Sequence, residues 1–196
     1  MEATGRHSVA NDLALVAVFG ALITAFSIVP AIPIGIGVPI TLQTLAVVLA
    51  GLVLGPWRGA LATALYIVVG LAGLPVFAGG IAGPAIFGRP SIGYLLAFPL
   101  GAILAGLIAR RVANWRGAKQ YAGFFVAGIA GSLVIHASGI AGLILGVAHL
   151  NPTAAFLTDV AFWPADLLKM FVAAAIAVAV HRAFPAVLTA RRPVTA

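Results

Sequence analysis

The chain is 196 residues long, with 63% hydrophobic and only 8% charged residues, and this composition excludes a soluble domain. Too few polar side chains are present to cover a water-facing surface, so the sequence predicts an all-α integral membrane protein. The formal charge is +7, but the cations are scattered between apolar runs without interleaved aromatic residues, which argues against a nucleic-acid partner. The absence of cysteine excludes disulfides, thiolate metal sites and a cysteine nucleophile.

Six predominantly apolar runs, separated by Gly, Pro and Arg, are each predicted to cross a hydrocarbon core about 30 Å thick. They cover approximately residues 13–29, 40–55, 59–74, 92–109, 121–150 and 164–184. Together they predict a single six-helix membrane domain over residues 1–196, with a polar N-terminal segment at 1–12 and a tail at 185–196. The first run has no clear cleavage site of small residues, so we interpret it as a retained span and not as a signal peptide.

The distribution of basic residues predicts the topology. If the N-terminus is cytoplasmic, nine of the eleven cations fall on the cytoplasmic side, namely Arg6, Arg58, Arg110, Arg111, Arg116, Lys119, Arg182, Arg191 and Arg192. Cytoplasmic segments of membrane proteins carry an excess of Lys and Arg, so both termini are predicted to be cytoplasmic. The two exceptions, Arg89 and Lys169, fall on the outer side. Together with Asp166 they favour an outward-facing site for a small organic anion.

Asp166 and Lys169 stand out in the last apolar run, directly after Trp163 and Pro164. A proline in the first turn predicts a helix start there, which places Asp166 near the positive end of the helix dipole and Lys169 one turn later on the same face. Such a pair can bind a small molecule with an N–H group and an acid, or it can be an ion pair that only braces neighbouring helices. Asp159, nearer the preceding loop, is interpreted as solvated.

Other polar residues of the apolar runs leave two interpretations open. Thr41, Gln43 and Thr44 could donate to a ligand or merely cap the second helix. His136 is interpreted as a buried, hydrogen-bonded packing residue, because no second His or carboxylate lies at metal-ligand spacing from it. No metal site or cofactor is therefore expected.

Two further segments suggest functions. The stretch 74–91 is long, apolar and rich in Gly and Pro, which is typical of a lid over a cavity. Ala17, Ala21 and Ala25 recur every four residues and predict a smooth helix face, either for a separate membrane subunit or for an internal packing seam. The sequence contains no nucleotide-binding loop, zinc-protease motif or triad, so ATP hydrolysis and enzymatic activity are excluded. It also lacks the internal symmetry of a self-sufficient secondary transporter, so an energised partner is expected.

Four motifs in order resemble the BioY family, the biotin-binding S components of energy-coupling factor (ECF) transporters. They are the stretches 38–47 (VPITLQTLAV), 70–80 (GLAGLPVFAGG), 93–96 (GYLL) and 164–169 (PADLLK), and the likeness covers nearly all of residues 12–184. The resemblance implies a six-helix S component, in a multi-pass arrangement in the bacterial inner membrane. It would capture biotin from outside, as a substrate and not a cofactor, and associate with a T-component membrane subunit and two ABC-type ATPases.

The resemblance also assigns site residues. Asp166 would accept from the ureido nitrogens, and Lys169 and Arg89 would face the carboxylate or the ring carbonyl. Tyr94, with Phe77, Phe87 and Trp163, would pack on the bicyclic ring and the valeryl chain. Gln43 is a further candidate, as are Gly79 and Gly80, which offer only backbone groups. The alanine stripe would contact the T component. The alternatives are a stand-alone gradient-driven permease, an S component for another small carboxylated vitamin, and a scaffold without a ligand.

Overall fold

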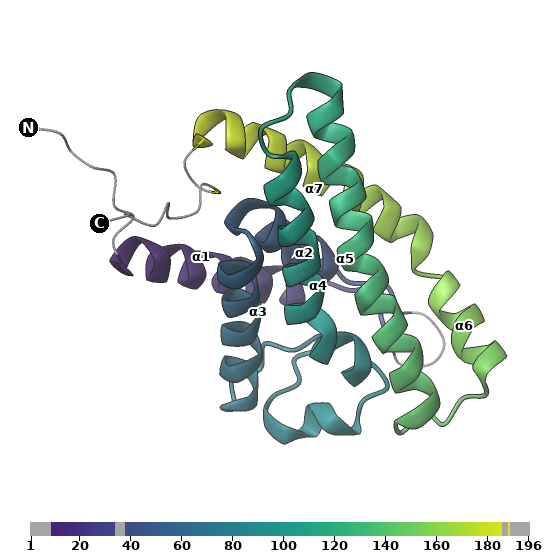
Figure 1. Cartoon of the computed structure of the whole chain (residues 1–196). Coiled ribbons are helices and arrows are strands. Elements are labelled where there is room, and N and C mark those ends of the chain that lie inside the picture. The colour runs from purple at the N-terminus through teal and green to yellow at the C-terminus, as the bar shows by residue number, and fades with distance from the viewer. Residues whose placement is uncertain (1–8, 34–37, 186–187, 189–196) are drawn as a thin grey trace, which may run out of the picture.

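Figure 1 shows the computed structural model of the chain, which describes residues 9–33, 38–185 and 188. Within these residues the fold is all helical, and the elements are α1 (Val9–Ile28), α2 (Gln43–Leu54), α3 (Pro56–Leu71), the 3-10 helix η1 (Gly83–Gly88), α4 (Ile92–Val112), α5 (Gly117–Leu145), α6 (Pro152–Val160) and α7 (Trp163–Ala183). Two isolated β-bridges, Ile32 with Ile40 and Phe77 with Ile81, close loops. Arg6, Arg191 and Arg192 lie outside the described residues.

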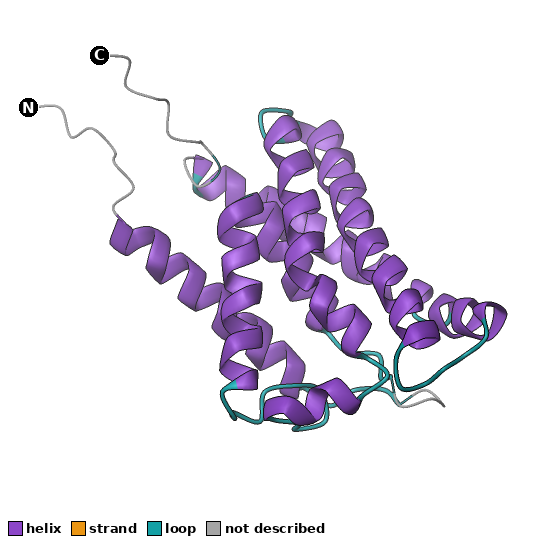
Figure 2. Ribbon diagram, turned by 60° about the horizontal axis from the view of Figure 1, so that its bottom comes forward, coloured by secondary structure: helices purple, strands orange, loops and turns teal. Residues whose placement is uncertain are grey.

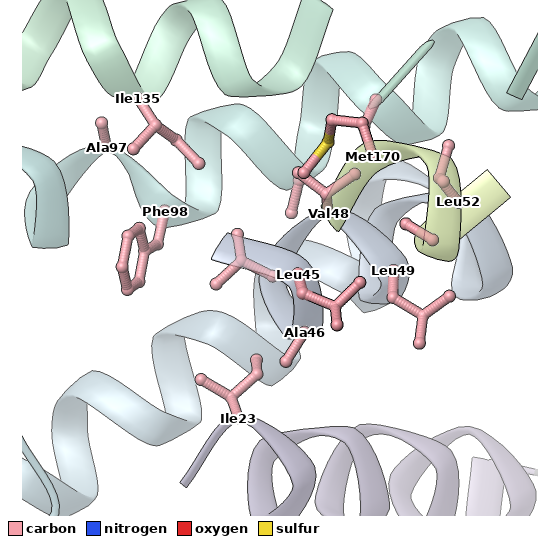
Figure 3. Close-up of a cluster of buried hydrophobic side chains, with 14 of the residues drawn as sticks. Ile23, Leu45, Ala46, Val48, Leu49, Leu52, Ala97, Phe98, Ile135 and Met170 are labelled. Atoms are coloured by element: carbon pink, nitrogen blue, oxygen red, sulfur yellow. The ribbon is translucent and has the colours of Figure 1, made fainter. Parts of the chain in front are cut away.

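The central element is α2. Every residue of this helix except Thr44 is buried, and α1, α3, α4, α5 and α7 all pack against it. From Leu45 to Leu54 it contains only Leu, Val, Ala and one Gly. A helix that is apolar on all sides is expected to be surrounded by protein or lipid, and here it is surrounded by protein. Figure 3 shows this core, in which side chains of α1, α4, α5 and α7 lie around those of α2.

Four helices, α1, α4, α5 and α7, are long and apolar enough to cross a membrane, whereas α2 and α3 are apolar but shorter. The 12 residues of α2 span about 18 Å, less than a hydrocarbon core of about 30 Å. Because neighbouring helices enclose α2, its length is not constrained by lipid contact. The chain is therefore an all-helical membrane protein, in which each predicted apolar run contains one of the helices α1 to α5 or α7.

The fifth predicted run extends too far. It was expected to continue to residue 150, but α5 ends at Leu145 and the chain turns back through Gly146. The N–H of Leu150 donates to the carbonyl of Leu143 at 2.9 Å, which fixes this turn. The short helix α6 follows, and the side chain of Asn151 caps it by accepting from the N–H of Ala154 at 2.8 Å.

The described cations divide between two ends of the bundle. At one end, which we call the basic end, α1, α3 and α5 begin and α2, α4 and α7 end (Figures 1 and 2). It carries Arg58, Arg110, Arg111, Arg116, Lys119 and Arg182. Arg58 pairs there with Asp12 at 3.0 Å and so joins the starts of α3 and α1. Toward the opposite end lie η1, which Arg89 follows, the loop that joins α3 to α4, and the start of α7, which contains Lys169.

Candidate ligand-binding site

A cavity lies at the end of the bundle opposite the basic end, where the α3–α4 loop and the segment before α2 cover it. About 620 Å³ of space within it is not filled by atoms, a volume that includes the part open to solvent. Most of the surface of its wall is apolar, and its larger apolar side chains are Val38, Phe77, Ile86, Leu95, Phe98 and Phe162. The polar residues of the wall are Thr41, Gln43, Thr44, Tyr66, Ser91, Tyr94, His136, Asp166 and Lys169.

Asp166 and Lys169 form a buried pair in this wall. They are 3% and 8% exposed, and Nζ of Lys169 lies 2.5 Å from Oδ1 of Asp166. Thr44, at the start of α2, contacts both partners. Its hydroxyl donates to the same carboxylate oxygen at 3.0 Å, and it lies 3.1 Å from the ammonium. Asp166 is in the first turn of α7, where the helix dipole stabilises its negative charge.

His136 of α5 extends this pair into a larger polar cluster. Its Nδ1 lies 2.7 Å from Oδ1 of Asp159. Its Nε2 lies 3.0 Å from Oδ2 of Asp166, in an orientation too oblique for a good hydrogen bond. The imidazole therefore stands between two carboxylates. His136 is buried and hydrogen-bonded, as predicted, but it also lines the cavity.

Asp159 of α6 is the outer support of the cluster, and its interpretation as a solvated residue was wrong. It is only 1% exposed. Its carboxylate accepts from the hydroxyl of Tyr94 at 2.9 Å and from Nε1 of Trp163 at 3.1 Å. The Trp163 ring also stacks on His136, with ring centroids 4.7 Å apart. Burial of the charge is possible because these three side chains satisfy the carboxylate.

A second set of hydrogen-bonded polar residues joins the cavity wall to the covering loop. Nε2 of Gln43 donates to the hydroxyl oxygen of Tyr66 at 2.6 Å, and that hydroxyl donates to the carbonyl of Val76 at 3.1 Å. Ser27, in the last turn of α1, also donates to the Val76 carbonyl. Gln43 is thus held in place by Tyr66, while it still borders the cavity.

Two glycines make room for the aromatic walls. Tyr94 packs directly on the backbone of Gly139 in α5, and a methyl group added at this glycine would overlap the phenol ring. Phe77 packs in the same way on Gly70 of α3. Both rings are buried. A larger residue at either glycine would therefore displace a side chain that borders the cavity.

The structure brings together five of the predicted ligand-binding residues, because Gln43, Phe77, Tyr94, Asp166 and Lys169 all line the cavity. The other four do not line it. Arg89 follows η1 and is exposed, Gly79 and Gly80 lie in an exposed turn with φ of +79° and +72°, and Trp163 lies behind the wall on His136 and Asp159. Phe87 is 52% exposed.

The sequence reasoning missed His136, Asp159 and Tyr66 as parts of the site. Asp159 could have been recognised from the sequence as a candidate site residue. The chain has only four acidic residues in all, and an intramembrane carboxylate is functional by default. No local pattern pairs His136 with either carboxylate, since α5, α6 and α7 meet only in the folded chain.

Comparison with known proteins identifies the family of the chain. The family model of the BioY family matches residues 1–186. This chain belongs to the BioY family. Among its relatives are proteins named biotin transporter BioY, from Rhizobium etli and Rhodobacter capsulatus. The first is 42% identical over 179 residues, 89% of this chain and 95% of the relative. The second is 40% identical over 189 residues, 92% of this chain and 98% of the relative.

A solved structure also resembles this BioY-family chain. It is the crystal structure, at 2.1 Å, of the S-component for biotin from an ECF-type ABC transporter. The TM-score is 0.82 with 26% sequence identity, and the match covers 88% of this chain and 92% of the other. The helical arrangement described above is therefore the arrangement of an S component. Family membership also agrees with the sequence argument that the chain is a transport protein and not an enzyme.

Proposed function

We propose that this chain captures biotin with high affinity as the substrate-binding S component of an ECF-type vitamin importer. The names of its relatives and of its structural neighbour support biotin as the substrate. The observation that carries the proposal is the cavity itself, in which a buried Asp166–Lys169 pair faces a space with mainly apolar walls. Biotin combines a polar ureido ring with an apolar thioether ring and an acyl chain that ends in a carboxylate.

The contact between Asp166 and Lys169 restricts the orientation of the ligand. Because the two side chains are in contact, both face the same end of a bound molecule. The ureido ring offers N–H donors for Asp166 and a carbonyl acceptor for Lys169 side by side, whereas a carboxylate offers acceptors only and would repel Asp166. We therefore place the ureido ring at this pair, the ring system against Phe77 and Tyr94, and the valeryl chain toward the covering loop. Arg89 is then the cation available to the carboxylate at the surface.

For the membrane arrangement, we propose one six-helix domain over residues 1–196 in the bacterial inner membrane, with α1 to α5 and α7 as the spans. The basic end would face the cytoplasm, together with segments 1–12 and 185–196. The support is the charge asymmetry, since six described cations lie at the basic end and cytoplasmic segments are enriched in Lys and Arg. The cavity then opens to the outside.

The proposed partners are a T-component membrane subunit and two ABC ATPases. The chain has no nucleotide-binding loop of its own, so the energy for uptake has to come from another subunit. Ala17, Ala21 and Ala25 support a docking face on α1, because all three are exposed while Gly20, Ile23 and Ser27 of the same helix are buried. No cofactor is required by this scheme.

A stand-alone permease is the second candidate, and the buried His136 between two carboxylates favours it. Chains of buried Asp and His are typical of proton-coupled transporters. Uptake of labelled biotin in cells that lack all ECF ATPases separates the two. Uptake that persists there and stops with an uncoupler would support the permease, and uptake that requires the ATPases supports the S component.

Calorimetry with purified protein tests the site. Asp166→Asn and Lys169→Ala should each weaken biotin binding by about ten- to a hundredfold, because hydrogen bonds to charged groups contribute about 1.5–3 kcal/mol. Arg111→Gln, an exposed charge change at the basic end, is the control and should bind normally. Each single variant leaves a buried charge unpaired, so the double variant Asp166→Asn/Lys169→Met is included as a folded reference. Normal binding in both single variants would refute the site.

Biotin amide, which lacks the negative charge, tests the place of Arg89. The unmodified protein should prefer biotin to its amide, and Arg89→Gln should remove that preference while leaving the affinity for the amide unchanged. If Arg89→Gln keeps the preference and Lys169→Ala loses it, the ligand lies in the opposite orientation.

A further inference from the structure

The basic end contains a second cavity, far from the site described above. Arg110 of α4, Arg116 of the α4–α5 loop, and His181 and Arg182 of α7 line it, together with Gln120 of α5. It holds about 1670 Å³ of empty space, counting the part open to solvent. Nothing in the proposed capture of a ligand at the other end uses these residues.

Two buried polar atoms of this cavity have no hydrogen-bond partner within the described chain. One is Nε of Arg110 and the other is Nδ1 of His181. His181 is only 6% exposed. Its Nε2 donates to the carbonyl of Leu52 at 2.9 Å, which fixes the ring, and its Nδ1 has no partner. Buried polar groups nearly always have a partner. Because Nε2 of His181 donates, its Nδ1 is an acceptor in the neutral ring, whereas Nε of Arg110 is a donor. The unpartnered Arg110 donor therefore indicates a ligand with acceptor oxygens.

The charge of the cavity specifies an anion. Among the described carboxylates only Asp12 lies at the basic end, and it is paired with Arg58 at 3.0 Å. Arg116 and Arg182 are exposed, and no ion pair of theirs is found in the described part of the chain. Three arginine side chains around one space match the oxygens of a phosphate group, which guanidinium groups bind in a bidentate manner.

The position of the cavity specifies the source of that phosphate. It lies where α4 ends at Val112, α5 begins at Gly117 and α7 ends at Ala183. In the membrane arrangement proposed above, this is the level at which these helices would leave the hydrocarbon. Trp115 also lines the cavity, and the ammonium of Lys119 lies 4.5 Å above its ring. Tryptophan and basic residues gather at the headgroup level of membranes, and basic pockets between helices at that level bind anionic headgroups.

We propose that this cavity binds the phosphate headgroup of an anionic phospholipid, with Arg110, Arg116 and Arg182 around the phosphate. A water-soluble phosphate offers the same oxygens, but it would not make the contact with Trp115 at the membrane interface. This proposal is independent of the ligand at the other end of the bundle.

The test uses the full chain, purified and placed in nanodiscs of phosphatidylcholine or of an equimolar mixture with phosphatidylglycerol. Retained lipid is counted by native mass spectrometry, and thermal unfolding is followed in both discs. We expect phosphatidylglycerol to be retained and to raise the unfolding temperature. Arg110→Gln, Arg116→Gln and Arg182→Gln should each weaken retention by about fivefold, the effect of one basic side chain near a charged membrane surface.

Arg111→Gln is the matched control, because it changes the same charge on the same helix end but does not line the cavity. Equal loss in Arg111→Gln would show only general attraction to a charged surface and would overturn the site. Stabilisation by inorganic phosphate alone in phosphatidylcholine discs would overturn the lipid assignment in favour of a free anion. Absence of any lipid preference, with partner subunits lost from the arginine variants on co-purification, would assign the cavity to a protein contact instead.

Discussion

Asp159 illustrates how much a single side chain contributes to the candidate site without touching the cavity. It holds Tyr94, His136 and Trp163 at once, and His136 in turn lies against Asp166. The position of the ligand-facing carboxylate therefore depends on a carboxylate on another helix. Such indirect support is common around binding sites, where the residues that contact the ligand are positioned by a second set.

Asp159→Asn tests this support. The amide keeps only one acceptor oxygen, so at least one hydrogen bond to a charged group is lost, at a cost of about 1.5–3 kcal/mol in the free energy of unfolding. Thermal unfolding in detergent should show the loss, and biotin affinity should fall as well. Asp12→Asn is the control, because it breaks a partly exposed ion pair that contributes about 0–1 kcal/mol. Equal stability of the two variants would contradict the role given to Asp159.

At the scale of elements, the close approach of α4 and α5 sets the place of Tyr94. The ring lies directly on the backbone of Gly139, so the two helices can approach only if this position lacks a side chain. Tyr94 then reaches Asp159 across the cavity wall. The packing of α4 against α5 therefore determines the position of a side chain that borders the cavity.

Gly139→Ala should move the Tyr94 ring and force a strained core, with a cost of about 1–3 kcal/mol and weaker binding of biotin. Gly88→Ala is the matched control, since an added methyl group there meets nothing within 4 Å and φ is not in the left-handed region. Unfolding temperature and calorimetry measure both effects. Normal binding and stability in Gly139→Ala would show that the helices can separate without loss.

The exposed alanine face of α1 leads to a different kind of prediction. Ala21→Leu should leave biotin affinity unchanged but should reduce uptake by cells that express all subunits by about tenfold or more, because close helix contacts depend on small residues. Val126→Leu adds bulk at an exposed position of α5, a different helix, and serves as the control. If the two variants take up biotin equally well, the alanine face is not the docking surface.

How much of the structure could be predicted from the sequence differs from element to element. The spacing of Asp166 and Lys169 on one helix predicted their contact because it is a local property of a helix. The contacts of His136 with Asp159 and Asp166 could not be predicted, since they join three elements through the packing of the whole bundle. Arg89 lies in a loop, whose path a periodic pattern does not determine. The bounds of α1 to α4 and of α7 were predicted within a few residues, α5 was predicted to end too late, and α6 was not predicted.

At the scale of the whole molecule, the separation of charge and cavity gives the bundle two unlike ends. The basic end would face the cytoplasm and the cavity the outside. The chain contains no cysteine, so single cysteines report on this orientation without background.

Cells that carry Gly88→Cys should react with a membrane-impermeant maleimide, because this exposed position ends η1, within the covering α3–α4 loop at the cavity end. Ala118→Cys, at the start of α5 on the basic end, should react only after the membrane is made permeable. Labelling is read as a mass shift on gels. The reverse pattern would place the cavity on the cytoplasmic side and would contradict the proposed topology.

The carbonyl oxygen of Val76 accepts hydrogen bonds from the hydroxyl groups of both Ser27 and Tyr66. One acceptor thus connects the loop above the cavity with the final turn of α1, the helix whose outer face is free. Displacement of that helix by a neighbouring subunit would pull on the same oxygen that keeps the loop down. If α1 is the docking face of a partner subunit, as proposed above, this peptide group would connect that contact with the loop over the cavity.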